Sequence, residues 1–467
     1  MQITISKQAK RSFSLVLIAS LFLLAASCRP TAPTGSNGGT TTTDKKPVLT
    51  KDPITLEYWR LFDDSTIFDS YIKSYQSQHP NINIEVKTIA LSGTYDVYSY
   101  QSDIIKLIAD GGGPDMFMLN NTWLPYQKSE IAPVSTGQES LQTFKDTYPT
   151  VVQNDFVDNN RVYAVPYSVD DLVLYYNTDL FSANKIKQPP ATLAALADLV
   201  PVLTKRDAKG NITQSAINLG GTTGIPRAAD ILSALMMQYG AEMTSTDHST
   251  AVFNLPTPGV QPPYFGGQQA LSYYSQFADP SSRYYTYTDA KDASGNRLFP
   301  SDAQAFGEGK AAMFIGYSYQ IQSLKKFYPK LHFDTAPLPQ LKPQDPVNVA
   351  NYWGETVSKT SQHPNEAWDF ILFMANKSNQ NSFFHDAGYI PARSDLITNY
   401  KDRQYYGAVA KQVAYSKSWY RQNTPKVETI FDQMIVNVAT KSLSAKDAID
   451  VAVRDINALD GPPLNSQ

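Results

Sequence analysis

The sequence predicts an α/β fold built on a mainly parallel sheet. Between residues 54 and 119, three stretches have the pattern of strands, and the two stretches that separate them have helical spacing. The 467-residue chain has a single cysteine, Cys28, near its start, so a buried apolar core must stabilise the rest without disulfide bonds. At roughly 100 to 200 residues per domain, this length favours two or three domains.

The N-terminus has the parts of an export signal. Basic residues at positions 7, 10 and 11 precede the apolar run 12–24, and the small residues 25–27 stand directly before Cys28. The pattern resembles a bacterial lipobox, which implies that residues 1–27 are a signal peptide and that Cys28 is lipidated. Because Ala25 departs from the usual leucine or valine, a secretory peptide with an incidental Cys28 is the alternative. A membrane-spanning helix is disfavoured, since the run is shorter than the roughly 20 residues that a bilayer requires.

The segment that follows, residues 28–53, is rich in Thr, Gly, Pro, Ser, Asn and Lys and has no apolar periodicity. Such a composition does not bury enough surface to fold, so we expect a disordered tether. A flexible spacer of about 25 residues reaches roughly 25 to 30 Å, which would keep the folded part near the membrane.

Residues 54–119 predict the first α/β layer. ITLEYW (54–59) and NINIEVKTI (81–89) alternate with strand period on either side of a helix that ends at His79-Pro80. A second helix over 97–108 ends at the glycines 111–113 and leads into the apolar strand MFML (116–119). Because α/β sheets bind ligands at the carboxyl ends of their strands, the residues after the first and third strands are candidate contacts. These are Trp59, Asp63, Asp64, Asn120, Asn121 and Trp123.

Three later segments also have predicted structure. Residues 163–176 form a long apolar run broken by Pro166, as expected of a strand that leaves one sheet and enters another. Residues 204–219 predict two short strands around a turn at 209–211. Ser444 and Asp447 form a capping box that predicts a terminal helix.

Five segments, taken in order, resemble the carbohydrate-type extracellular solute-binding proteins that serve ABC importers. They are LIADGGGPDMFMLNN (107–121), RVYAVPYSVDDLVLYYNTDLF (161–181), AFGEGKAAMFIGYSY (305–319), APLP (336–339) and HPNEAWDFILFMANKSNQNSFFHDAGYIPAR (363–393). The resemblance implies a two-lobed, type II periplasmic-binding-protein-like fold with a ligand cleft between lobes joined by crossing strands. The first lobe would take residues 54–166 and 352–394, and the second lobe residues 167–351 and 395–460.

The resemblance and the chemistry of sugars select the other candidate contacts. A sugar presents an apolar C–H face and a rim of hydroxyls, so its site needs aromatic platforms beside Asp, Glu, Asn or Arg side chains. Ser318 stands where many relatives carry a stacking tryptophan, and it is flanked by two tyrosines. The candidates from the crossings and the later segments are Ser168, Asp170, Asp171, Tyr317, Tyr319, Trp353, Glu355 and Arg393.

For several of these candidates a structural role is an open alternative. Asp63 or Asp64 could cap the helix that follows, and Trp123 could be a core residue. Asp171 could be solvated, and Arg393 could bind backbone carbonyls. Trp368 shares a helical stripe with apolar residues, so we expect it in the core.

Composition and motifs exclude several other functions. The 43 acidic and 40 basic residues nearly balance, so nothing indicates nucleic-acid binding. The sequence has no P-loop, no G-x-G-x-x-G and no G-x-S-x-G. Its five histidines are scattered, so neither a metal nor a cofactor is expected.

The function implied by the resemblance is the capture of a mono- or oligosaccharide, without a covalent step. Closure of the lobes on the sugar would present it to the membrane subunits of an ABC importer. The protein would be exported, lipid-anchored at the outer side of the cell membrane and monomeric. The alternatives are a secreted glycan hydrolase that uses cleft carboxylates, and a surface scaffold or adhesion protein of the same fold.

Overall fold

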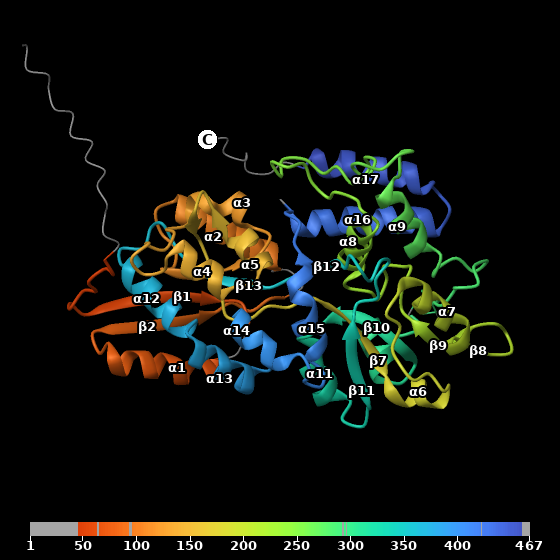
Figure 1. The fold of residues 1–467 in the computed structure, drawn as a ribbon, viewed down its shortest axis with the longest axis horizontal. Helices are drawn as coiled ribbons and strands as arrows, with labels where there is room; N and C mark the ends of the chain where they lie inside the picture. The colour runs from red at the N-terminus through yellow and green to blue at the C-terminus, as the bar shows by residue number, and fades with distance from the viewer. Residues whose placement is uncertain are drawn as a thin grey trace, which may run out of the picture. The chain divides into compact units, whose positions relative to one another are not determined.

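The computed structural model describes residues 45–62, 65–92, 96–291, 294–295, 297–421 and 423–459. The predicted signal peptide, Cys28, Asp63 and Asp64 lie outside these described residues. The described chain holds two five-stranded sheets with helices packed on them (Figure 1). None of its helices combines the length and apolarity needed to span a bilayer.

Residues 45–53, which we predicted to be part of the tether, contact the body of the protein. Lys46 Nζ lies 2.9 Å from Asp369 Oδ1, and Thr50 N donates to Glu366 Oε1 at 2.7 Å. Asn81 Nδ2 donates to the carbonyl oxygen of Thr50. These residues therefore belong with the fold. Their composition could not indicate this, because most of the contacts are made by backbone atoms.

The first sheet has the order β2-β1-β3-β13-β6. Its strands are β1 (Ile54–Arg60), β2 (Ile82–Thr88), β3 (Met116–Asn120), β6 (Val165–Pro166) and β13 (Trp353–Val357). β1 pairs parallel with β2 and β3, as predicted, whereas β13 is antiparallel to both β3 and β6. The prediction of a mainly parallel sheet is therefore wrong for the β13 side, because β13 enters from a distant part of the chain in the opposite direction.

Two helices of this half, α1 (Ser65–Gln78) and α2 (Val97–Ala109), begin and end close to the predicted positions. The others are α3 (Leu124–Gln127), α4 (Leu141–Thr147), α5 (Thr150–Phe156), α12 (Pro364–Met374), α13 (Lys377–Ala387) and α14 (Ser394–Ile397). α1 packs on β2, and α12 packs on β13. Trp368 of α12 is buried and its Nε1 donates to the carbonyl oxygen of Ala132, which confirms its place in the core. α2 is followed by Gly111 at φ +83°, a left-handed conformation that glycine adopts readily.

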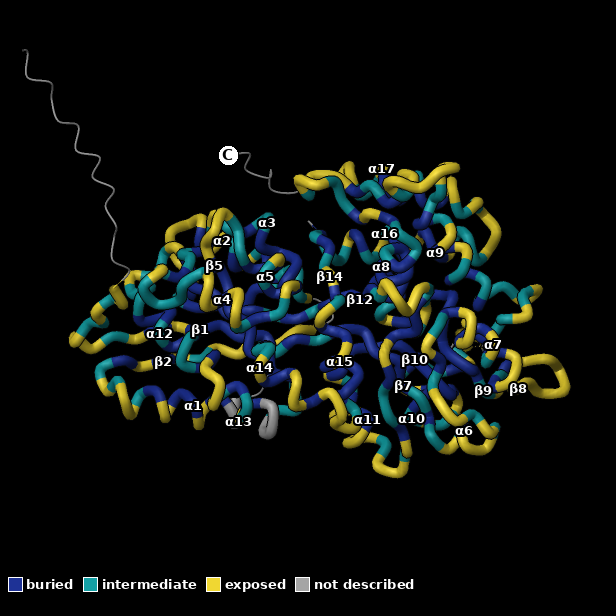
Figure 2. Tube along the Cα trace, viewed as in Figure 1, coloured by how far each residue is buried: buried dark blue, intermediate teal, exposed yellow. Residues whose placement is uncertain are grey.

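The second sheet has the order β11-β7-β10-β9-β8. Its strands are β7 (Leu172–Asn177), β8 (Lys205–Arg206), β9 (Ile212–Ile217), β10 (Ala311–Tyr317) and β11 (Phe333–Pro337). β9 and β10 are parallel, and the other pairs are antiparallel. β8 and β9 are the two short strands predicted around residues 209–211, with Gly210 at φ +85° in the turn. The central strands β3, β7, β10 and β13 are largely buried, whereas the edge strands β2 and β8 are more exposed (Figure 2).

The helices of the second half pack around this sheet. They are α6 (Thr178–Ala183), α7 (Leu193–Leu203), α8 (Ala228–Gln238), α9 (Gly266–Ser275), α10 (Asp302–Gly307), α11 (Gln320–Phe327), α15 (Gly407–Gln412), α16 (Thr424–Ala439) and α17 (Ala445–Asn457). α7 packs on β9, α10 on β10 and α15 on β11. The predicted terminal helix is α17, and Ser444 Oγ caps it by accepting a hydrogen bond from Asp447 N.

Two segments connect the two sheets, and a third segment, which joins α15 to α16, lies beside them. In the first, Pro166 ends β6 and Leu172 begins β7, which confirms the predicted change of sheet. The second leads through β12 (Asn348–Val349) into β13, and the third contains β14 (Ser416–Lys417), which pairs parallel with β12. Asn351 N donates to Asp170 O at 3.0 Å, and Ala350 N donates to Lys417 O at 3.0 Å. We call these three segments (residues 167–171, 348–352 and 416–421) the crossing.

Candidate functional site

Asp170 is the half-buried carboxylate at the centre of the crossing. Its Oδ1 accepts hydrogen bonds from Ser318 N at 3.0 Å and from Asp171 N at 2.9 Å, and its Oδ2 accepts one from Tyr319 N at 3.3 Å. Burial raises its pKa to about 7, although the N–H donors of residues 318 and 319 oppose this rise. Asp170 therefore fixes the start of α11 against the first crossing segment.

Asn120 joins the end of β3 to the same crossing. Its Nδ2 donates to Asn351 Oδ1 at 3.2 Å, and its Oδ1 accepts from Thr122 N and Thr122 Oγ1 at 3.1 and 2.8 Å. Asn351 N in turn donates to the carbonyl oxygen of Asp170. A continuous chain of hydrogen bonds thus links the end of the first sheet to residues 318 and 319 of the second half.

The aromatic residues beside Asn120 form one cluster. Trp353 lies opposite Asn120 in the β3–β13 pair, and its ring meets Trp123 edge-on with centroids 5.1 Å apart. On its other side it meets Phe62 at 5.7 Å, again edge-on. Phe62 is 41% exposed, whereas Trp123 is buried. We call Phe62, Trp123 and Trp353, together with Asn120, the aromatic wall.

The second half contributes two tyrosines and an arginine. The rings of Tyr317 and Tyr319 are stacked, with centroids 6.2 Å apart and an angle of 22° between their planes. Tyr317 is buried and its hydroxyl donates to Asp230 Oδ2 at 3.0 Å, whereas Tyr319 is 40% exposed. Arg227 Nη2 donates to the hydroxyl of Tyr319 at 3.2 Å. We call Arg227, Asp230, Tyr317 and Tyr319, together with Arg421, the charged wall.

Two predicted contacts, Trp59 on β1 and Glu355 on β13, have protein partners. Trp59 Nε1 donates to Glu57 Oε1 at 2.6 Å, and Lys87 Nζ lies 4.0 Å from the centre of its ring. Glu355 is buried, and its Oε1 lies 3.3 Å from Arg60 Nη1. The side chains of both residues lie on faces of the sheet that other protein groups cover. We do not include them in the candidate site.

Asn121 and Asp171 are also buried and hold the crossing together. Asn121 Nδ2 donates to Ser418 Oγ at 2.7 Å, and its Oδ1 accepts from Tyr352 N at 3.2 Å. Asp171 is fully buried rather than solvated, and its Oδ2 accepts from Ser416 Oγ at 2.8 Å. The carboxyl of Asp171 and the amide of Asn121 form hydrogen bonds between segments of the chain. We therefore assign both residues a structural role and not a ligand contact.

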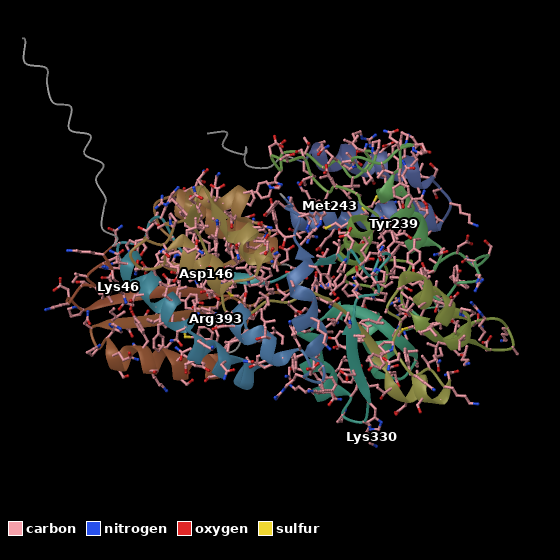
Figure 3. The ribbon with its side chains drawn as sticks, viewed as in Figure 1. Lys46, Asp146, Tyr239, Met243, Lys330 and Arg393 are labelled. Carbon is pink, nitrogen blue, oxygen red and sulfur yellow. The ribbon has the colours of Figure 1, made fainter. Side chains whose placement is uncertain are left out.

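Ser168 lies in the first crossing segment, beside the residues that directly precede Arg393. Ser168 is half-buried and forms an isolated bridge with Pro391. Arg393, labelled in Figure 3, precedes α14, and its Nε donates to Asp395 Oδ1 at 3.1 Å. The guanidinium of Arg393 thus bonds to a carboxylate, whereas backbone carbonyls were the expected alternative. Asp63 and Asp64 lie outside the described residues.

Three residues near the site were not predicted from the sequence. Phe62 follows the first strand directly, so the rule that selected Trp59 could have found it. Asn351 precedes Trp353 and could have been found with it. Arg227 had no such signal, because it follows an unassigned loop and stands just before α8.

A buried cluster around Asp155 of α5 ties the third crossing segment to the first half. Asp155 Oδ2 accepts from Tyr352 Oη at 2.5 Å, from Ser418 Oγ at 2.8 Å and from Asn121 Nδ2 at 3.2 Å. Burial raises the pKa of Asp155 to about 7, although these donors lower it. The cluster makes the crossing a hydrogen-bonded layer of three segments.

A groove elsewhere in the second half contains none of the predicted site residues. It has a volume of about 500 Å³ and lies at the end of β7 away from the crossing. Its lining includes Asp179, Tyr328 and Lys330, the last labelled in Figure 3. Among the described residues, no three His, Cys, Asp or Glu side chains are grouped to hold a metal ion.

Comparisons with known proteins agree with this architecture. The model of the family described as bacterial extracellular solute-binding protein matches residues 70–405. An uncharacterised ABC transporter extracellular-binding protein of Pyrococcus horikoshii is 23% identical over 81% of this chain and 80% of its own. A galactooligosaccharide-binding protein of Bacillus subtilis is 21% identical over 96% of both chains.

A solved structure shows the likeness of fold. The crystal structure of a cyclo/maltodextrin-binding protein complexed with maltotetraose superposes with a TM-score of 0.68, covering 87% of this chain and 97% of that one at 18% identity. The two-lobed α/β fold of the type II periplasmic-binding-protein kind, predicted from the sequence, is confirmed.

Proposed function

Because the chain belongs to the bacterial extracellular solute-binding protein family, we propose that the solute it delivers to an ABC importer is a mono- or oligosaccharide. Family membership places the protein outside the cytoplasm and separates it from enzymes, including the glycan hydrolase considered above. Two relatives reported above are, by name, a galactooligosaccharide-binding protein and a cyclo/maltodextrin-binding protein, and these names support a sugar as the solute.

The observation that carries the proposal is the bonded connection between the aromatic wall and Tyr319. Phe62 and Trp353 offer apolar faces on the side of the first sheet, and Tyr319 offers one on the side of the second. Asp170, Asn120 and Asn351 place carboxylate and amide groups between them. Flat apolar faces beside hydrogen-bonding groups match the two kinds of surface that a sugar presents.

Closure of the two lobes would deliver the sugar to the importer. We place the lobes at residues 54–166 with 352–394, and at 167–351 with 395–460; the changes of sheet after β6 and before β13 support the first two boundaries. The ligand would contact both lobes and so favour the closed state, since it binds that state more tightly than the open one. The crossing would act as the hinge.

Anchoring of the protein is a further part of the proposal. The basic, apolar and small residues before Cys28 support export, cleavage after residue 27 and lipidation of the cysteine. The protein would then act as a monomer tethered to the outer side of the membrane. Metabolic labelling with a fatty acid should mark the wild-type protein and leave Cys28→Ser unlabelled; equal labelling of both would contradict the assignment.

The test of the sugar assignment is a thermal-shift screen of the purified full chain against mono- and oligosaccharides, with amino acids and polyamines as controls. A solute that binds only the native state raises the melting temperature by mass action. We expect a saturable shift with one class of saccharide and no product after incubation. Trp353→Ala should reduce the shift, because it removes the centre of the aromatic wall. A shift with amino acids or polyamines and with no saccharide would overturn the assignment.

A further inference from the structure

The charged wall holds more positive than negative charge close to Tyr319. Asp230, in the first turn of α8, is almost fully buried and is shared by two arginines. Its Oδ1 accepts from Arg421 Nη2 at 3.1 Å, and its Oδ2 lies 3.8 Å from Arg227 Nη1. One carboxylate therefore faces two guanidinium groups, and its second oxygen also accepts from Tyr317.

The guanidinium of Arg421 has unused hydrogen-bonding capacity. Its side chain is only 5% exposed, and neither Nε nor Nη1 has a hydrogen-bond partner among the described residues. Nη1 lies 3.7 Å from Glu428 Oε1, which is too long for a hydrogen bond. A buried cation with unmet donors is unfavourable unless an anionic or polar group lies nearby.

Further charged groups of both signs surround these arginines. Arg297 packs against Gly224 in the loop before α8, where a Cβ at residue 224 would lie 1.9 Å from its Nη1. Glu428 and Asp302 are the neighbouring carboxyls; burial raises the pKa of Glu428 and raises that of Asp302 to about 6. The N-terminal end of α8 points its partial positive charge to the same place.

Arg227 is the member of this wall that a ligand can reach. Its side chain is 30% exposed, and its Nη2 contacts the hydroxyl of Tyr319, which is itself exposed. Its Nε is buried and has no hydrogen-bond partner among the residues that the structure describes, so a ligand would meet the terminal nitrogens of the guanidinium. A planar guanidinium beside an exposed aromatic ring matches a carboxylate attached to a sugar ring, which it binds through two parallel hydrogen bonds.

We propose that the saccharide bound at this site carries a carboxylate, as in a uronic acid unit, and that Arg227 pairs with this group beside Tyr319. The inference rests on the proposed function and names its substrate class. Arg421 is a positioning residue: it binds Asp230 and thereby fixes the carboxylate that faces Arg227. A phosphate would present the same anionic chemistry, but it favours several cations around it, and Arg227 is the accessible one in this wall.

The test compares matched pairs of ligands by isothermal titration calorimetry on the full chain. The probes are disaccharides of galacturonate, glucuronate and mannuronate, each beside its neutral counterpart, with the sugar phosphates as a third arm. We expect one uronate to bind at least tenfold more tightly than its neutral counterpart. This preference should shrink at high salt, because ions screen an exposed pair.

Variants then test whether Arg227 causes the preference for the uronate. Arg227→Met should bring the uronate and neutral affinities within about twofold of each other and leave neutral binding measurable, whereas Arg227→Lys should keep part of the preference. Arg421→Met should reduce the ratio without abolishing neutral binding, and its melting temperature reports any loss of folding. The matched control is Arg283→Met, since Arg283 also lies over a tyrosine and pairs with an aspartate, but on the surface. It should keep the wild-type ratio.

The possible results test the preference for a carboxylate separately from the proposed function of binding a saccharide. Neutral sugars that bind as tightly as uronates would overturn the inference and leave the proposed function standing. Sugar phosphates that bind more tightly than uronates would overturn the choice of carboxylate. An equal loss of both ligands in Arg227→Met would assign the arginine to a hydroxyl instead and would also overturn it. No binding by any saccharide would overturn the proposed function itself.

Discussion

The two walls that meet at the crossing are built by different means. In the aromatic wall, Trp353 is held between Phe62 and Trp123 by ring contacts that have no charge. In the charged wall, Tyr319 is held by a bond from Arg227, which belongs to a buried network around Asp230. Apolar platforms accept many sugars, whereas fixed charges discriminate among them. In the proposed site, this difference would assign affinity to one side and selectivity to the other.

The largest effect is expected when a buried ion pair that supports the aromatic wall is broken. Glu355 lies on β13, the strand that carries Trp353, and pairs with buried Arg60 at 3.3 Å. Glu355→Ala removes the partner of a buried cation and should lower the free energy of unfolding by about 3 to 5 kcal/mol. Urea denaturation measures this loss. A loss below about 1 kcal/mol would show that the remaining contacts of Arg60 are sufficient.

The second prediction concerns the crossing between the walls. The pKa of Asp155 is raised from 3.8 to about 7. Between pH 3.8 and about pH 7, the folded state therefore retains a proton that the unfolded state has lost. The contribution of Asp155 to stability should therefore fall as the pH rises from about 4 to about 7, by roughly 2 kcal/mol after discounting the shift.

Denaturation of wild type and Asp155→Asn at pH 5 and pH 8 isolates this contribution. The groups that face Asp155 are Tyr352, Ser418, Asn121 and Tyr420, so the variant keeps every other titrating neighbour. We expect the free energy of unfolding of the wild type minus that of Asp155→Asn to be larger at pH 5 than at pH 8. If this signed difference is larger at pH 8, the hydrogen-bond donors outweigh burial.

The third prediction contrasts the two walls directly. Trp353→Ala should weaken the binding of all sugars by about 1 to 2 kcal/mol, because it removes apolar contact area. Arg227→Met should instead weaken binding of the acidic ligand much more than that of the neutral one. Calorimetry with one acidic and one neutral sugar gives four affinities. Similar selectivity changes in both variants would remove the distinction between the walls.

The smallest effect is expected at the edge of the aromatic wall. Phe62→Ala should reduce sugar affinity by about 1 kcal/mol or less and leave the melting temperature nearly unchanged, because the residue is 41% exposed. Leu298→Ala, which truncates an exposed apolar residue in the second half, is the matched control. A reduction in affinity by Leu298→Ala equal to that by Phe62→Ala would contradict the placement of the site.

Much of the fold could be predicted from periodicity, because strand and helix patterns are local. This holds for β1 to β3, for α1 and α2, and for the change of sheet at Pro166. The direction of β13 could not be predicted from pattern alone, since it depends on a partner more than 200 residues earlier in the chain.

The candidate site was predicted less completely. Asp170, Asn120, Trp353 and Tyr319 lie along one bonded connection, although their contact with a ligand remains a prediction. Asp171 and Glu355 have the right chemistry, but their burial depends on packing between distant segments. Arg227 gave no signal, because a single arginine before a helix has no motif.

The place of β13 in the first sheet also constrains how the protein forms. β13 pairs with both β3 and β6, yet it is made only after all five strands of the second sheet. During export and synthesis, the first sheet therefore has to wait with unpaired strand edges until residue 357 emerges. Such edges are templates for association with other chains. A chain that stops before residue 353 should accordingly aggregate rather than yield an independently folded first lobe, and the second sheet should become protease-resistant earlier than the first.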